Sequence, residues 1–103
     1  MKSSSEIRFD FQNAMEQAKK LDALADNIER RVVNKLDETS QSVHAAWKGD
    51  SANRYLIKTQ ELQRQIRQTA NALRNTAQDI RQIARRIYEA EMRALEIARN
   101  RKA

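Results

Sequence analysis

The stretch Ala45-Ala46-Trp47-Lys48-Gly49-Asp50-Ser51-Ala52-Asn53, at the midpoint of the chain, decides the fold. It holds the only tryptophan and the only glycine of the 103 residues, and the chain has no proline. Gly49 can take a positive φ and so end a helix, which other residues do at a cost. Asp50 or Ser51 can then cap a second helix. A link this short predicts two antiparallel neighbouring helices, an αα-hairpin.

Apolar residues ahead of the bend recur at alternating steps of four and three, which is the heptad pattern of a long helix packed along one stripe. The stripe runs through Ile7, Phe11, Ala14, Ala18, Leu21, Ala25, Ile28, Val32, Leu36, Thr39, Val43 and Ala46. The step from Val32 to Leu36 repeats a four, so we expect slight local unwinding there and no break. Ser3 and Glu6 fit a capping box, which predicts a helix start near residue 4.

The second half repeats the pattern more strictly, with polar residues between the apolar positions. Its stripe runs through Ala52, Leu56, Thr59, Leu62, Ile66, Thr69, Leu73, Thr76, Ile80, Ile83, Ile87, Ala90, Ala94 and Ile97. The two stripes predict helix one over about 4–46, a turn over 47–51 and helix two over about 52–100. We expect residues 1–103 to form a single helical hairpin domain.

Two helices with narrow apolar stripes do not make a full core, because each stripe is covered by one neighbour only. The expected solution is pairing with a second hairpin. The predicted fold class is therefore all-α, an antiparallel two-helix hairpin that dimerises into a four-helix bundle. The residues expected at the partner interface are Leu21, Ile28, Val32, Leu56, Leu62, Ile66, Leu73, Ile80, Ile83 and Ile87.

The formal charge of +6 is unevenly spread along the chain. Residues 1–53 carry 8 Lys/Arg and 9 Asp/Glu, whereas residues 54–103 carry 12 Lys/Arg and 5 Asp/Glu. A basic second helix could meet nucleic acid, an acidic membrane surface or an acidic protein. The start of the chain has no apolar signal-peptide core, and no run approaches the roughly 18 apolar residues of a membrane span. Export would need a route that reads no such signal.

The residues argue against an enzyme. His44 is the only histidine and there is no cysteine, so nucleophile-and-base and cysteine-metal chemistry have few candidates. Glu89 and Glu91 are two residues apart and do not share a helix face. One glycine cannot build a phosphate-binding loop. We therefore expect no catalytic residues, no metal site and no cofactor.

Trp47-Lys48-Gly49 at the bend between two long heptad helices, in a chain of about a hundred residues, resembles the WxG (ESAT-like) family of type VII secretion proteins. The resemblance implies a folded helical dimer, exported by a type VII (ESX-like) system and recognised by its secretion ATPase. The partner would be a second copy, a related small helical protein or the helical N-terminal domain of a larger effector.

The resemblance also implies an export signal shared across the dimer. Trp47 and Gly49 of one chain would combine with an acidic motif near the C-terminus of the other chain. The common motif, Tyr-x-x-x-Asp/Glu, fails here because Met92 stands four residues after Tyr88. A looser family pattern is matched by Ile87, Glu91, Ala94 and Ala98. Either this chain carries a degenerate signal or its partner supplies the signal.

The resulting functional prediction is a small protein made in the cytoplasm of a bacterium and secreted without a signal peptide. It would act as a co-exported helical partner, adaptor or chaperone of an effector such as a toxin, and its basic charge suits an acidic partner. The alternative is a basic helical nucleic-acid-binding protein, because Arg67, Arg74 and Arg81 share one stripe and could track phosphates. Against this, the arginines flank the apolar stripe and do not precede it as a basic block.

Overall fold

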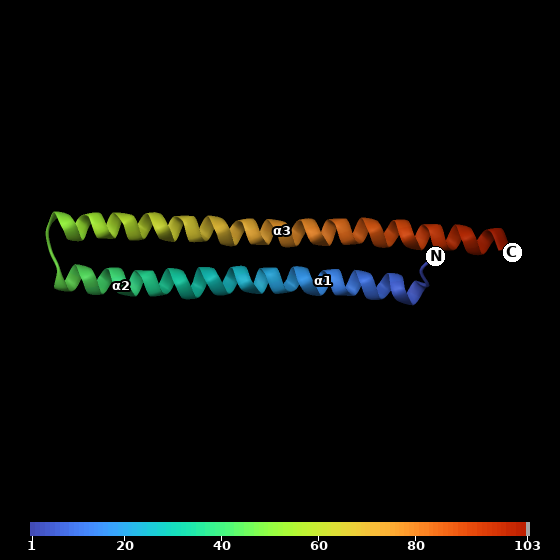
Figure 1. Ribbon diagram of the computed structural model, residues 1–103, viewed down its shortest axis with the longest axis horizontal. Helices are drawn as coiled ribbons and strands as arrows, with labels where there is room; N and C mark the ends of the chain where they lie inside the picture. Colours follow the sequence, from blue (N-terminus) through green and yellow to red (C-terminus); the bar gives the residue numbers. More distant parts are fainter. Residues whose placement is uncertain (103) are drawn as a thin grey trace. The chain divides into compact units, whose positions relative to one another are not determined.

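The structure, a computed structural model, describes the backbone of residues 1–102 and the side chains of residues 1–101, and every regular element in this range is helical. The elements are α1 (Ser4–Asn27), the π-helical turn η1 (Ile28–Val32), α2 (Val33–Ala46) and α3 (Asp50–Lys102). Residues 47–49 bend the chain between α2 and α3 (Figure 1). The predicted all-α class and the hairpin of two long helices are confirmed.

The predicted capping box marks the start of α1. The backbone N–H of Glu6 donates to the Ser3 hydroxyl oxygen at 3.2 Å, and this hydroxyl lies 3.3 Å from the Glu6 carboxylate. The N–H of Ile7 donates to the Ser3 carbonyl at 3.0 Å. The Glu6 N–H, one of the backbone donors that a helix start leaves open, is thereby satisfied, and the Ile7 bond is the first of the regular helix.

The chain divides into two compact units. The bend unit spans residues 22–74, and the open-end unit combines residues 1–21 with the chain from residue 75 onward. In each unit, a segment from the first half of the chain lies beside a segment of α3 (Figure 1). The two units are described separately below.

The seam between the paired segments is made mostly of alanine. In the open-end unit the buried residues are Ile7, Ala18, Ala77 and Ala84. In the bend unit they are Ala25, Val33, Ser40, Ala52, Thr59 and Ala70. None of the larger side chains in the described range is fully buried. Small side chains let helix backbones approach closely, but each buries little apolar area.

From residue 62 on, the seam on α3 lies one residue later than the heptad stripe predicts, whereas Ala52 and Thr59 are buried at their predicted positions. The predicted members Leu62, Thr69, Thr76 and Ile83 are exposed. The residues that follow them, Gln63, Ala70, Ala77 and Ala84, are buried or half-buried. The physical reason is that alanine permits the closest helix approach, so the alanine column faces the neighbouring segment and the larger aliphatic column lies beside it.

The predicted phase slip is present as the π-helical turn η1, one turn earlier than expected. A π turn accommodates one extra residue, so the stripe passes from one valine to the next. Val33 is 7% exposed and packs in the seam, whereas Val32 is 39% exposed on the outside. The Gln63 side-chain amide donates to the Val33 carbonyl at 3.1 Å and ties α3 to α2 at this register.

Enlarging a seam alanine tests the close approach. Ala77 is 0% exposed, and we expect Ala77→Leu to lower the free energy of unfolding by about 1–3 kcal/mol, because the seam has no room for three extra carbons. The measurement is chemical unfolding followed by circular dichroism. Gln82→Leu, at an exposed position of the same helix, is the control and should leave stability near that of the wild type. Equal stability of the two variants would contradict the alanine seam.

Candidate functional site

The bend is shaped by an extended tryptophan and a glycine in the left-handed half of φ space. Trp47 has φ −139° and ψ 125°, and its N–H donates to the Val43 carbonyl at 2.8 Å, which closes α2. Gly49 has φ 107°, and its carbonyl accepts from the N–H of Asn53 at 3.1 Å as α3 begins. A Cβ at Gly49 would meet no atom within 4 Å, so the backbone angle alone requires glycine.

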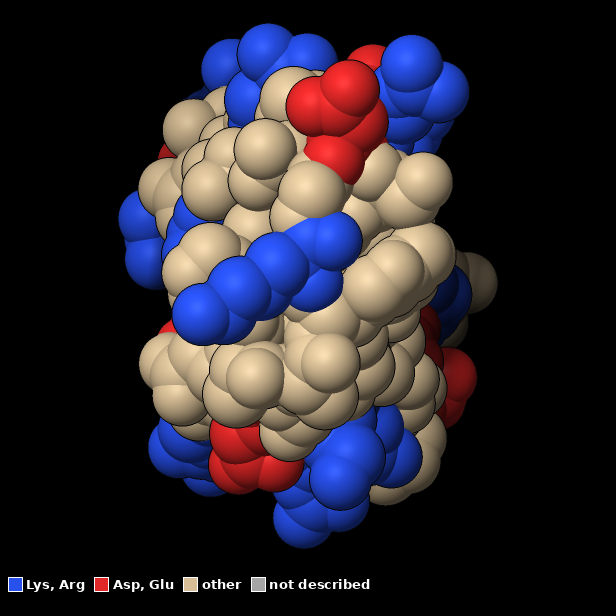
Figure 2. Space-filling model, turned by 90° about the vertical axis from the view of Figure 1, so that its left-hand side faces the viewer, with Lys and Arg blue, Asp and Glu red and all other residues tan. Residues whose placement is uncertain are grey.

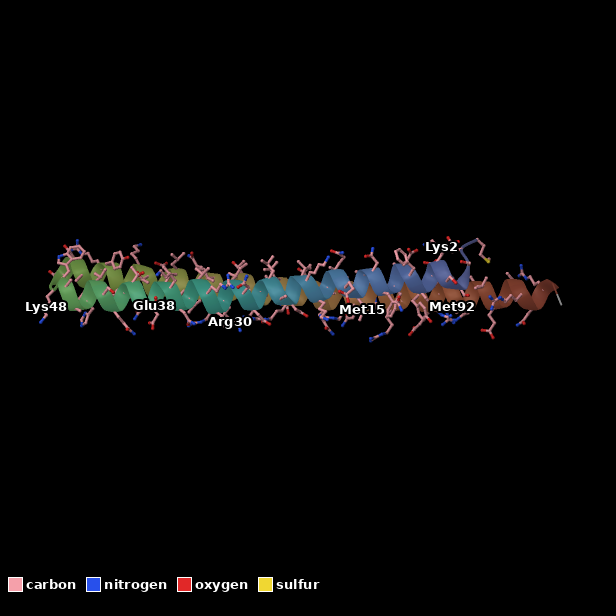
Figure 3. All side chains as sticks on the ribbon, turned by 90° about the horizontal axis from the view of Figure 1, so that it is seen from below. Lys2, Met15, Arg30, Glu38, Lys48 and Met92 are labelled. Carbon is pink, nitrogen blue, oxygen red and sulfur yellow. The ribbon has the colours of Figure 1, made fainter. Side chains whose placement is uncertain are left out.

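The bend presents an apolar ring beside a positive charge. Trp47 is 49% exposed, so its ring is not buried. Lys48 follows it and, like Arg30 and Glu38, points away from the paired segments (Figure 3). Seen from this end, much of the surface is uncharged, one Lys or Arg side chain lies across its middle, and further Lys and Arg side chains lie nearer its edges together with a few Asp or Glu side chains (Figure 2). A half-exposed tryptophan is typical of residues that become buried in a protein interface.

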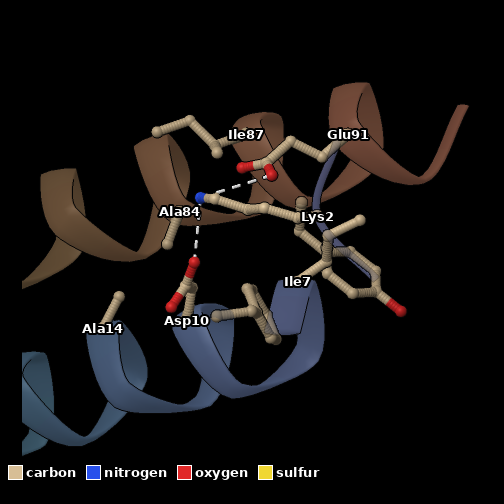
Figure 4. Close-up of a pocket in the computed structure, with 9 residues that line it drawn as sticks. Lys2, Ile7, Asp10, Ala14, Ala84, Ile87 and Glu91 are labelled. Atoms are coloured by element: carbon tan, nitrogen blue, oxygen red, sulfur yellow. Dashed lines mark hydrogen bonds and ion pairs between the residues drawn. The ribbon is translucent and has the colours of Figure 1, made fainter. Parts of the chain in front are cut away.

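The second part of the predicted signal lies late in α3, in the open-end unit. Ile87 is 52% exposed, and the Glu91 side chain is 27% exposed. The Glu91 carboxylate lies 3.4 Å from the Lys2 ammonium (Figure 4). Tyr88, between them in sequence, turns inward and packs on Phe11 with ring centroids 4.9 Å apart. The acid of the degenerate motif is therefore already paired within its own chain.

The predicted partner-interface residues fall into two groups by exposure. Those against the flank of the seam are half-buried: Leu21, Ile28, Leu56, Ile66, Leu73 and Ile80. Those further out are exposed: Val32 at 39%, Leu62 at 45%, Ile87 at 52% and Ile83 at 54%. We call Leu62, Ile83, Ile87 and Ile97, the exposed aliphatic residues of α3 that belong to the predicted heptad stripe, the outer stripe; Ile57, 62% exposed, lies off this stripe.

In the bend unit, the half-buried residues Ile28 and Leu73 lie on the same side of the helix pair. Arg74 follows Ala70 by four residues and forms an ion pair with Glu29, which follows Ala25 by four. Because one helical turn takes 3.6 residues, the residue three after a seam position lies on one flank of the seam line and the residue four after it lies on the other. Since Glu29 and Arg74 share one flank, Ile28 and Leu73 share the other. At this point of the unit, one flank of the seam is therefore apolar and the opposite flank carries the ion pair.

The sequence did not predict this ionic flank. It bears on the interpretation of Arg67, Arg74 and Arg81 as a stripe that could bind phosphates. The Arg74 guanidinium lies 2.8 Å from Asp26, pairs with Glu29 and donates to the Asn71 side-chain oxygen at 2.8 Å. The hydrogen bonds to the two carboxylates hold the pKa of Arg74 above its ordinary value. Arg81 also has a partner, the Gln78 side-chain oxygen at 3.4 Å. Arg74 is thus committed to carboxylates of its own chain, which weakens the phosphate-tracking interpretation of Arg67, Arg74 and Arg81.

The residues that sequence reasoning missed are the seam alanines and the cations that cross between segments. Ala70, Ala77 and Ala84 repeat every seven residues, so their period was visible, but the larger aliphatic column beside them had the same period. Lys2 gave no local signal, because its partners are distant in the sequence. Asp10 lies eight residues away, and Glu91 lies late in the second half of the chain. In the described part of the chain, no cluster of His, Asp or Glu could hold a metal ion, and no helix is long and apolar enough to cross a membrane.

Comparison with known proteins gives one match. A family model described as "WXG100: Proteins of 100 residues with WXG" matches residues 6–92. No curated protein and no solved structure matches the chain. The matched range includes the bend, the alanine seam and Glu91.

The bend geometry makes a direct prediction for Gly49. A side chain at φ 107° is strained even where space is open, so Gly49→Ala should lower the free energy of unfolding by about 1–2 kcal/mol. Lys48→Ala changes the neighbouring bend residue, which has no positive φ, and should leave stability nearly unchanged. Thermal unfolding by circular dichroism compares the two. A Gly49→Ala variant as stable as Lys48→Ala would show that the bend does not require glycine.

Proposed function

Because the chain belongs to the WXG100 family, we propose that it is a co-exported helical partner, an adaptor or chaperone that pairs face to face with a second helical hairpin. Membership in the family implies a type VII secretion substrate, and proteins of the family are non-enzymatic, secreted and typically dimeric. We propose in addition that the apolar face of the hairpin is the one that pairs, and that this protein carries its partner during export.

The single observation that carries the proposal is the outer stripe beside an alanine seam. In a solitary hairpin, Leu62, Ile83 and Ile87 keep about half of their surface in water. Burying the exposed part of such a side chain is worth on the order of 1 kcal/mol at 25 cal/mol per Å². Several such residues along one helix supply a driving force for association that the seam itself lacks. Pairing of two apolar faces would complete a four-helix bundle.

The bend and the late part of α3 are proposed as the export signal. Trp47 and Gly49 would form one half, with the exposed indole as the contact group. Ile87 and Glu91 would form the other half, contributed by the partner in the dimer. A secretion ATPase would then recognise the two halves together, so that only a paired protein is exported.

The adaptor role rests on charge. The chain has a formal charge of +6, with the excess on α3. Arg64, Arg85 and Arg86 are exposed, so an acidic helical partner would meet favourable long-range attraction. This supports a heterodimer with the helical N-terminal domain of an effector as the working complex, with self-pairing as the resting form.

A charge placed in the outer stripe tests the pairing face. Ile83 is 54% exposed, so Ile83→Asp should leave the hairpin folded but remove association, because an unpaired carboxylate in an apolar interface costs several kcal/mol. Gln82→Asp adds the same charge at an exposed neighbouring position and should associate like the wild type. Light scattering at low and high salt gives the mass of each variant. A dimeric Ile83→Asp variant would place the interface elsewhere.

The export signal is tested separately from folding and pairing. Trp47→Ala removes a half-exposed ring, so helicity and association should remain near wild-type values while export falls to background. The measurements are circular dichroism, light scattering and secretion from a host with a type VII system, with Lys48→Ala as the control. Wild-type secretion of the Trp47→Ala protein would remove the bend from the proposed signal.

A further inference from the structure

The N-terminal strap, residues 1–3 ahead of α1, reaches across to α3 within the open-end unit. The Lys2 ammonium donates to the Asp10 carboxylate at 2.9 Å and lies 3.4 Å from the Glu91 carboxylate. In Figure 4 the Lys2 side chain extends between these two acids, one from each helical segment. A single cation therefore links the start of α1 to the late part of α3.

The strap lies at the edge of an apolar cavity of about 230 Å³. Its walls are formed by Ile7, Phe11, Ala14, Ala84, Ile87 and Tyr88. Lys2, Asp10 and Glu91 complete its rim. The cavity is large enough for one sizeable apolar side chain, and apolar cavities of this kind favour apolar occupants over water.

The cavity is continuous with the outer stripe through Ile87, which belongs to both. Ile83 lies one helical turn before Ile87 and is exposed on the same flank of α3. A helix that packs along Ile83 and Ile87 would therefore meet the strap at the cavity rim. Such a helix would have to contact or displace the Lys2 side chain, which is 48% exposed.

We infer that the N-terminal strap is a built-in competitor of the partner, covering part of the cavity rim in the solitary chain and lifting when a second copy of the chain docks on the outer stripe. This inference rests on the proposed pairing face. When Lys2 leaves, Asp10 and Glu91 remain as two carboxylates beside an apolar cavity. A second copy suits this site, because exposed arginines of its α3 can pair with the two acids and its own outer stripe supplies the apolar group.

The ion pairs of the strap are exposed and weak enough to exchange. The side chains of Lys2 and Asp10 are 48% and 51% exposed, and ion pairs at such positions add little to stability and are screened by salt. The hydrogen bond to Asp10 raises the pKa of Lys2, so the ammonium stays charged throughout the neutral range. An incoming Lys or Arg can thus replace Lys2 without leaving a carboxylate unpaired.

Self-association of the full chain tests the competition. Lys2→Met removes the ammonium, and Lys20→Met removes the same charge at an exposed position of α1. By sedimentation equilibrium, Lys2→Met should associate at least threefold more tightly than the wild type, while Lys20→Met matches the wild type. A merely supporting role for Lys2 would give the opposite sign. Where the wild type associates, unchanged or weaker association of Lys2→Met therefore overturns the inference.

The cavity is probed directly with Nile red, a neutral apolar dye, at chain concentrations where each variant is monomeric. Lys2→Met should bind at least threefold more dye than the wild type or Lys20→Met, because its cavity rim is less covered. Equal dye binding overturns the strap. If no variant associates at any concentration while Lys2→Met still binds more dye, the strap stands as a partial cover of the cavity and the proposed self-pairing fails.

Discussion

The close approach of paired helical segments through alanine is the constraint on which the other features of this chain depend. Alanine columns at Ala18 and Ala25 on α1, and at Ala70, Ala77 and Ala84 on α3, allow backbones to lie near one another. The same columns bury little apolar surface per residue. An alanine seam brings the paired backbones close together but contributes little to the free energy of unfolding. The larger aliphatic residues are left on the outside. The exposed outer stripe follows directly from the choice of residue in the seam.

The two compact units maintain that seam with different polar contacts. In the bend unit, Gln63 donates to the Val33 carbonyl, and Arg74 pairs with Asp26 and Glu29 beside the π turn. Together they hold the register that places Val33 inside and Val32 outside. In the open-end unit, Lys2 joins Asp10 to Glu91. Polar contacts at the edge of an alanine seam specify the register where apolar packing is too uniform to do so.

The sequence was sufficient for the class of fold, and it was insufficient for the seam. Heptad steps and the single glycine predicted two long helices and a bend, because both signals are local. From residue 62 on, the predicted seam position on α3 was wrong by one residue, since Thr76 and Ala77, or Ile83 and Ala84, repeat with the same period. Only the packed structure decides which column faces inward. Contacts such as Arg74 to Asp26, 48 residues apart, have no local signal at all.

The candidate signal was predictable in its first half and ambiguous in its second. Trp47 and Gly49 stand out by composition alone, whereas Glu91 stands three residues after Tyr88 and not four. On a helix, neighbours at three and four residues lie on the same side, so the shorter spacing still keeps the ring and the acid together. Tyr88 and Glu91 do line one cavity, with Lys2 at its rim. If Glu91 acts in export, the strap that pairs with it would be the element to displace. Pairing and exposure of the acid would then be a single event, which would confine export to the assembled protein.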